Sequence, residues 1–142
     1  MDTITSRKLT HEGAMKVLNS AVERAHALNC HVSIAVVDDG GHLIAFTRSE
    51  KAELYSIAIA QTKAKSAALT RFPSGKKSPT GNERSDHHAL AITLAAGTDS
   101  FVTIEGGFPL FSEGEIVGAV AVSGAGGKDI DVAQTAAAAL GK

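Results

Sequence analysis

The sequence predicts an α+β domain with an antiparallel sheet flanked by helices, and three observations support this fold class. Helix-like and strand-like patterns follow one another along 142 residues, a length suited to one domain over 1–142. Turns at 39–41 and 113–114 join neighbouring strands, and such short turns force antiparallel pairing because parallel neighbours need long crossovers. Val117–Val122 is almost entirely apolar, which predicts a strand covered on both faces by helices or by another subunit.

The first half of the chain predicts a helix, a hairpin and a second helix. Apolar residues recur at helical spacing over Ala14–Leu28, and Thr10 is a suitable N-cap. The strands Val32–Val37 and Leu43–Arg48 flank an Asp-Gly-Gly turn, the strongest hairpin pattern in the sequence. Alanine then dominates Ala52–Leu69, which predicts a helix that lies close to the sheet.

The second half predicts a long polar loop followed by further strands and a final helix. The expected elements are the loop Phe72–Arg84, a helix His87–Ala96, a strand Phe101–Ile104, the paired strands Pro109–Ser112 and Glu115–Ser123, and a C-terminal helix Asp131–Leu140. A loop of this length is typically functional or mobile.

Composition argues against several functional classes. A net charge of −1, 4% aromatic residues and no tryptophan provide neither the basic surface nor the stacking side chains of most nucleic-acid binders. No apolar run reaches 18 residues, so we expect no membrane span, and the first nine residues do not resemble a secretory signal. Cys30 is the only cysteine, which excludes an intramolecular disulfide and favours the cytoplasm.

The glycine-rich stretch "GAVAVSGAGGKD" at 118–129 raises the question of a nucleotide site. A Walker loop needs Ser or Thr after its lysine, but Asp129 follows Lys128. The dinucleotide pattern needs a third glycine where Asp129 stands after Gly124 and Gly126. Both nucleotide fingerprints therefore fail, which leaves two alternatives: backbone N–H groups that bind an anion near a helix start, or a plain connection.

His87 and His88 are the histidines most open to a chemical role. Adjacent residues on a helix point about 100° apart, so the two cannot clamp one metal ion as an i, i+4 pair would, and we predict no metal site. Either could act singly, as an axial ligand to heme iron or as a general base. The alternative is that they cap the helix that follows Asp86.

A basic group lies at the end of the second predicted helix and in the loop after it: Lys63, Lys65, Arg71, Lys76 and Lys77. These side chains form either a solvated surface or a seat for the carboxylates of heme propionates or of a small organic acid.

Four stretches together resemble the GlcG/HbpS family of heme-binding proteins, which includes the C-terminal domain of PduO-type proteins. They are "VVDDGGHLIAFTR", "AQTKAKSAA", "GGFPLF" and "GEIVGAVAVSGAGGKDIDVA", and the resemblance covers about Leu9–Leu140. It implies a profilin-like or PAS-like fold, homo-oligomers, and a small-ligand pocket that takes heme in some members and promotes its degradation in others. The stretch "SPTGNERSDHH" matches no motif of the family, so we expect that loop to set the choice of ligand.

The resemblance and the residues together favour a small-molecule ligand, with heme named first. We expect a pocket between the sheet and the loops around Gly106 and Ser123, in which Arg48 and Lys63 bind ligand carboxylates. The full set of expected binding residues is Arg48, Lys63, His87, His88, Gly106, Gly107, Ser123 and Gly124.

Two other functions stay open. One is an enzyme acting on a small organic acid, with His87 or His88 as the acid–base group and Glu105 as a second titratable group. The other is a structural or accessory homo-oligomer whose loop contacts a partner protein.

Overall fold

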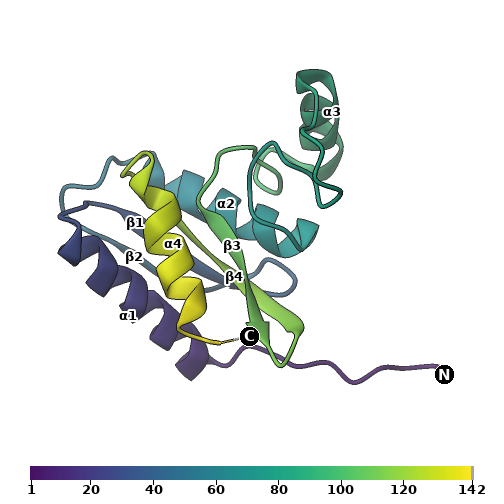
Figure 1. Cartoon of the computed structure of the whole chain (residues 1–142), viewed down its shortest axis with the longest axis horizontal. Coiled ribbons are helices and arrows are strands. Elements are labelled where there is room, and N and C mark those ends of the chain that lie inside the picture. The colour runs from purple at the N-terminus through teal and green to yellow at the C-terminus, as the bar shows by residue number, and fades with distance from the viewer. Residues whose placement is uncertain (142) are drawn as a thin grey trace.

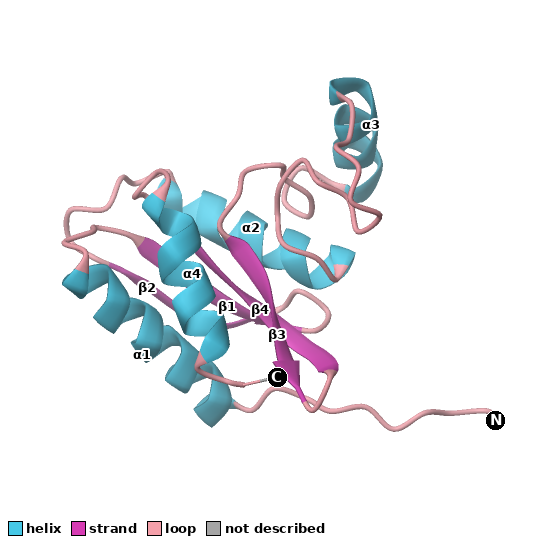
Figure 2. Cartoon of the chain, viewed as in Figure 1, coloured by secondary structure: helices cyan, strands magenta, loops and turns pink. Residues whose placement is uncertain are grey.

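A computed structural model describes residues 1–141 and contains four helices and four strands (Figures 1 and 2). In chain order these are α1 (His11–Ala27), β1 (Ser33–Asp38), β2 (Leu43–Arg48), α2 (Ser56–Thr70), α3 (Asp86–Ala96), β3 (Gly107–Ser112), β4 (Glu115–Ser123) and α4 (Lys128–Ala138). The α+β class is confirmed. Within this described part of the chain, no helix combines the length and the apolar character needed to cross a bilayer.

The four strands form one antiparallel sheet in the order β2-β1-β4-β3. Both predicted hairpins are present, β1 with β2 and β3 with β4, and β1 pairs with β4 in the middle. The edges of the sheet are therefore β2 and β3 (Figure 2). This order separates the end of β2 from the start of β3 by the full width of the sheet.

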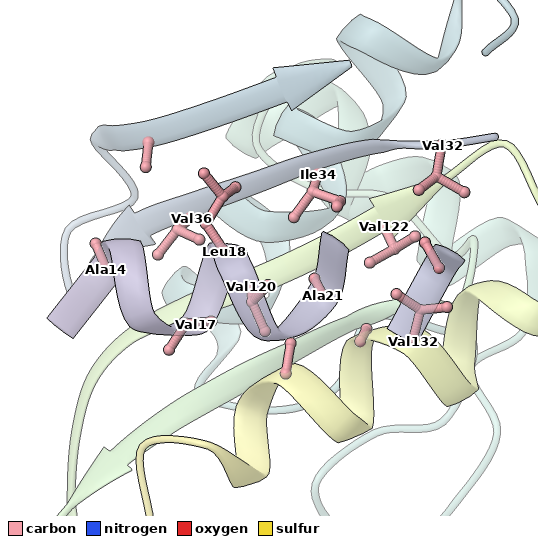
Figure 3. Packing of buried hydrophobic residues seen from close by; sticks show 14 of the residues in the cluster. Ala14, Val17, Leu18, Ala21, Val32, Ile34, Val36, Val120, Val122 and Val132 are labelled. Atoms are coloured by element: carbon pink, nitrogen blue, oxygen red, sulfur yellow. The ribbon is translucent and has the colours of Figure 1, made fainter. Parts of the chain in front are cut away.

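Helices cover both faces of β1 and β4, as the apolar run of β4 predicts. Most valines of these strands alternate with alanines, so these valines point to α1 and α4 on one face, while the alanines and Val37 point to α2 on the other. Figure 3 shows the first cluster, which joins Val17 of α1, Val36 and Val120 of the sheet, and Val132 of α4. Each such valine contributes about 1.5–3 kcal/mol through burial.

Small residues bring α2 close to the sheet. Ala60, Ala64 and Ala67 have no exposed surface, and they face Ala35 and Ala121 of the central strands. Alanine on both sides lets backbones approach closely, whereas larger side chains would force the layers apart. The close packing predicted from the alanine-rich sequence is therefore confirmed, although α2 begins at Ser56 rather than Ala52.

The prediction of a strand at Phe101–Ile104 is wrong, because these residues do not pair with any strand of the described sheet. The segment is tied instead to helix α2: the Val102 N–H donates to the Ser66 hydroxyl oxygen at 3.2 Å. A side chain thus satisfies the polar backbone that a neighbouring strand would have bonded. The last helix also begins earlier than expected, at Lys128.

Helix α3 stands apart from the sheet and its covering helices (Figure 1). None of its eleven residues is buried, although most of them are apolar. Its N-cap is Ser85, whose hydroxyl accepts from the His88 N–H at 3.1 Å. The capping role considered for the adjacent histidines therefore belongs to a serine.

Candidate ligand cleft

The Lys63 ammonium group is buried at the junction of α2, β4 and α4. It donates to the Val122 carbonyl at 2.8 Å and to Asp129 Oδ2 at 3.1 Å, and the Lys63 side chain is only 1% exposed. The other carboxylate oxygen of Asp129 accepts from the Ala125 N–H at 2.8 Å. The glycine-rich loop therefore binds the Asp129 carboxylate of its own chain, and Lys63 neutralises that carboxylate.

Two glycines bring the start of β3 against α2. A Cβ at Gly107 would lie 2.5 Å from the Lys63 carbonyl oxygen, so only glycine fits without a shift of the backbone. Gly106 has a φ of +123°, and a Cβ there would lie 3.0 Å from the side-chain nitrogen Nζ of Lys63. We call this buried group the Lys63–Asp129 lock, and it comprises Lys63, Asp129, Gly106 and Gly107.

The segment after α2 is held to the start of β3 by two hydrogen bonds between Ser74 and Gly107, one to the Ser74 side chain and one between backbone groups. The Gly107 N–H donates to the Ser74 hydroxyl, the Ser74 N–H donates to the Gly107 carbonyl, and both distances are 2.9 Å. These bonds hold the Phe72-Pro73 pair beside Phe108, on the side of β3 that faces α4.

A cleft of about 240 Å³ opens between this segment, β3 and α4, and we call it the β3 cleft. Two adjoining hollows of about 430 and 380 Å³ share residues with it, so the concave surface runs along this edge of the sheet. The β3 cleft has an apolar wall and a charged rim, formed respectively by Phe72, Pro73, Phe108 and Ile130, and by Lys76, Lys77 and Glu105.

The polar loop that carries the rim lysines is ordered as a small hairpin. Lys77 and Glu83 form an isolated antiparallel bridge, and the Arg84 N–H donates to the Lys76 carbonyl at 2.9 Å. The Arg84 guanidinium donates to the Lys77 carbonyl at 3.1 Å and lies 5.2 Å from the centre of the Phe101 ring. The rim is therefore fixed by bonds within the loop and by a contact to the body of the protein.

Of the residues that the sequence suggested for a ligand, Glu105 and the basic residues Lys76 and Lys77 line the β3 cleft itself. The lock residues Lys63, Gly106 and Gly107 lie behind the wall, in contact with protein groups. Ser123 is buried at the end of β4, and a Cβ at Gly124 would lie 2.9 Å from the His31 carbonyl oxygen. A ligand contact for any of these residues stays a prediction.

Arg48 and the adjacent histidines lie away from the β3 cleft wall. Arg48 ends β2 at the opposite edge of the sheet, beside a separate hollow of about 200 Å³. His87 and His88 are exposed in the first turn of α3. Asp86 precedes them, and its carboxylate lies 3.9 Å from the Lys76 ammonium, which brings that turn to the rim. Their proposed acid–base role remains a prediction.

The apolar wall is the part of the site that none of the sequence motifs indicated. Two of the three prolines in the chain follow a phenylalanine, at Phe72-Pro73 and at Phe108-Pro109. The repeated pair places an aromatic side chain beside a rigid backbone in two segments that the structure brings together. This pairing was the available sequence pattern for the wall.

Carboxyl groups with a shifted pKa lie outside the β3 cleft. Burial raises the pKa of Asp38, but bonds from the backbone N–H groups of His42 and Gly40 outweigh it, so the pKa lies below its usual value. The hydrogen bond from Arg24 lowers the pKa of Asp131, which joins α4 to α1 at 2.7 Å. Among residues 1–141, no group of three or more His, Cys, Asp or Glu side chains is placed to hold a metal ion.

The fold and the cleft define a class of protein: an antiparallel α+β sheet between helices, with an open hollow along one sheet edge. The family model described as haem degrading protein HbpS-like matches residues 9–140, and the chain therefore belongs to the HbpS-like family. The resemblance noted in the sequence is confirmed.

Three relatives place the chain within this family. It is 37% identical over 115 residues to the protein GlcG of Escherichia coli K12, covering 81% of each chain. The crystal structure of a double mutant of Streptomyces reticuli HbpS superposes with a TM-score of 0.76 at 29% identity, over 99% of this chain and 92% of that one. The crystal structure of a PduOC:heme complex gives 0.74 at 26% identity, over 95% and 96%.

Proposed function

We propose that this protein binds heme in the β3 cleft. The observation that carries the proposal is the position of an aromatic wall, Phe72 and Phe108, directly beside the ammonium groups of Lys76 and Lys77. Heme has the same two parts, a flat apolar macrocycle and two carboxylates at one edge. Burial of the macrocycle against the wall and charge-assisted bonds at the rim would hold it in one orientation.

The β3 cleft can cover a ligand of this size only together with the hollows beside it. Its volume of about 240 Å³ is small for a whole heme, but the adjoining hollows of about 430 and 380 Å³ extend the same surface. A relative of similar fold forms the PduOC:heme complex, which supports the choice of heme among flat acids. The residues present fit the macrocycle and its carboxylates.

Degradation of bound heme is a further part of the proposal. The family description names haem degradation, and bound heme would supply a redox-active iron. The side chains of this chain would bind the macrocycle, orient its carboxylates toward Lys76 and Lys77, and leave one face open to solvent. Loss of the Soret band with a reductant and oxygen present, at a rate above that of free hemin, would test this part.

Titration with hemin tests binding. We expect a saturable shift of the Soret band near one equivalent, which Phe108→Ser weakens at least tenfold. Lys16→Ala, which removes an exposed lysine of α1, provides a matched control for lysine variants of the rim. Absence of any spectral change with the unmodified protein would exclude heme binding. A thermal-shift screen of small organic acids would then test the alternative, an enzyme that uses Glu105 with His87 or His88.

A second observation favours self-association as an accessory function. Leu90 and Leu94 of α3 are 58% and 72% exposed, on a helix with no buried residue. Exposed apolar helices of this kind are typical of surfaces that a partner covers. We propose that copies of this chain cover α3 in a homo-oligomer, which would work in the cytoplasm as the single buried cysteine favours.

Light scattering tests this assembly. The double substitution of Leu90→Ser and Leu94→Ser should lower the measured mass, because it replaces the apolar side chains that would meet in the interface. Ile4→Ser removes an exposed isoleucine from the N-terminal segment and should leave the mass unchanged. An unmodified protein that is monomeric at tens of micromolar would rule out the assembly.

A further inference from the structure

We infer that the β3 cleft recognises the porphyrin macrocycle and its carboxylates rather than the iron, so that metal-free porphyrin binds about as tightly as hemin. The inference rests on the proposed function and specifies the chemistry that the site reads. Its basis is the composition and charge of the cleft lining.

The groups that line the β3 cleft are suited to an organic ring and not to a metal. Phenylalanine, proline and isoleucine form its wall, and lysine and glutamate form its rim. Heme iron in proteins is held by histidine, cysteine, methionine or tyrosine side chains. None of these residue types lines the β3 cleft or the two hollows that adjoin it, within residues 1–141.

The iron-ligating residue types are placed elsewhere in the structure. His42 lies at the β1–β2 turn, 3.2 Å from an Asp38 oxygen, and His26 and Cys30 line the separate hollow beside β2. His87 and His88 are exposed in the turn of α3 that Asp86 brings to the rim, and neither lines the β3 cleft or its adjoining hollows. A bound macrocycle would therefore meet aromatic and aliphatic carbon on its covered face.

The three charged groups of the rim differ in how they would interact with the carboxylates of a ligand. The Lys76 ammonium lies 3.9 Å from Asp86, whereas Lys77 has no carboxylate within 4.0 Å among residues 1–141. Lys77 is thus the cation more available to a ligand. Glu105 lies on the same rim and repels a ligand carboxylate, so its charge opposes binding.

This arrangement predicts a ranking of variants. Lys77→Ala should weaken porphyrin binding about tenfold, and Lys76→Ala should weaken it less, because a charge-assisted bond is lost in each case but Lys76 is already shared with Asp86. Glu105→Gln should strengthen binding several-fold. His87→Ala combined with His88→Ala should leave the affinity for hemin within about threefold of the unmodified protein.

The experiment measures protoporphyrin IX fluorescence with the full chain. The porphyrin is excited with visible light, which no side chain of this chain absorbs, so protein emission does not interfere. We expect a saturable change on binding, displacement of the porphyrin by hemin, and dissociation constants for the two that agree within about threefold. The dimethyl ester of the porphyrin, which lacks free carboxylates, should bind more weakly, and Lys77→Ala should reduce that difference more than Lys76→Ala does.

The outcomes separate this inference from the proposed function. Saturable hemin binding with protoporphyrin IX more than thirtyfold weaker would overturn the inference and leave heme binding standing. Loss of hemin binding in the double histidine variant would overturn it in the same way. Failure of both porphyrins to bind would reject the proposed function itself. Unchanged circular dichroism of each variant, with Lys16→Ala as the matched control, shows that lost binding is not lost folding.

Discussion

Two lysines lie on opposite sides of the start of β3, one buried and one exposed. Lys63 lies behind β3, 1% exposed and bonded to Asp129 and to a backbone carbonyl, while Lys77 lies in front of it on an exposed loop. The sequence groups both in one basic cluster. Burial and partners separate them: an ammonium group whose bonds are filled by the protein holds the fold, and one that faces a hollow is available to a ligand.

Breaking the Lys63–Asp129 lock should have the largest effect on stability. Lys63→Met keeps a long side chain but leaves the Asp129 carboxylate buried without its cation, so we expect a loss of about 3–5 kcal/mol in the free energy of unfolding. Urea denaturation measures the loss. Adding Asp129→Asn should restore part of it, and a single variant that loses under 1 kcal/mol would show that the lock does not hold the fold.

Gly107→Ala should have the next largest effect. Its Cβ would meet the Lys63 carbonyl, and the shift needed to relieve this contact should lower the free energy of unfolding by about 1–3 kcal/mol. Gly127→Ala is the matched control, because a Cβ there meets nothing within 4 Å. Equal thermal stability of the two variants would argue against close packing at the back of the β3 cleft.

Asp38 lies away from Lys63 and Lys77, and its contribution to the free energy of unfolding should depend on pH. Asp38→Ala removes the carboxylate that accepts from Gly40 and His42, and should cost about 1 kcal/mol at pH 7. Because the folded pKa of Asp38 is lowered, this contribution is complete above the unfolded value of about 3.9 and is lost as the pH falls through the folded value. The free energies of unfolding of the unmodified protein and of Asp38→Ala should therefore converge in acid. A constant difference between them down to pH 2 would contradict this.

Lys77→Ala should have the smallest effect on stability and a clear effect on binding. An exposed lysine whose ammonium lacks a carboxylate partner contributes within about 0.5 kcal/mol to folding. The melting temperature should match that of Lys16→Ala, while porphyrin affinity falls. A variant that unfolds like Lys63→Met would mean that the two lysines share a structural role.

Local patterns predicted most of the fold. The amphipathic spacing of α1, the turn at 39–41 and the apolar run of β4 each depend on neighbours in sequence, and each is present. Phe101–Ile104 has strand-like composition, yet Ser66 of α2 bonds its backbone and no strand pairs with it. A residue 36 positions away thus decided its structure.

The candidate site was less predictable than the fold. Glu105 was expected there, but the wall formed by Phe72 and Phe108 was not, because neither residue carries a chemical group that marks a site. Helices α2 and α3 show the same limit: both are rich in alanine, yet α2 packs against the sheet and α3 has no buried residue. Composition describes what a helix can bury, and the chain path decides what lies beside it.

The sequence by itself determined the fold class, the two hairpins, the family and the failure of both nucleotide fingerprints at Asp129. Only the tertiary structure decided what Asp129 does instead, which lysine it binds, and where a hollow remains. The physical reason is distance along the chain. Lys63 meets Val122 and Asp129 across 59 and 66 residues, and no local pattern records contacts between segments so far apart.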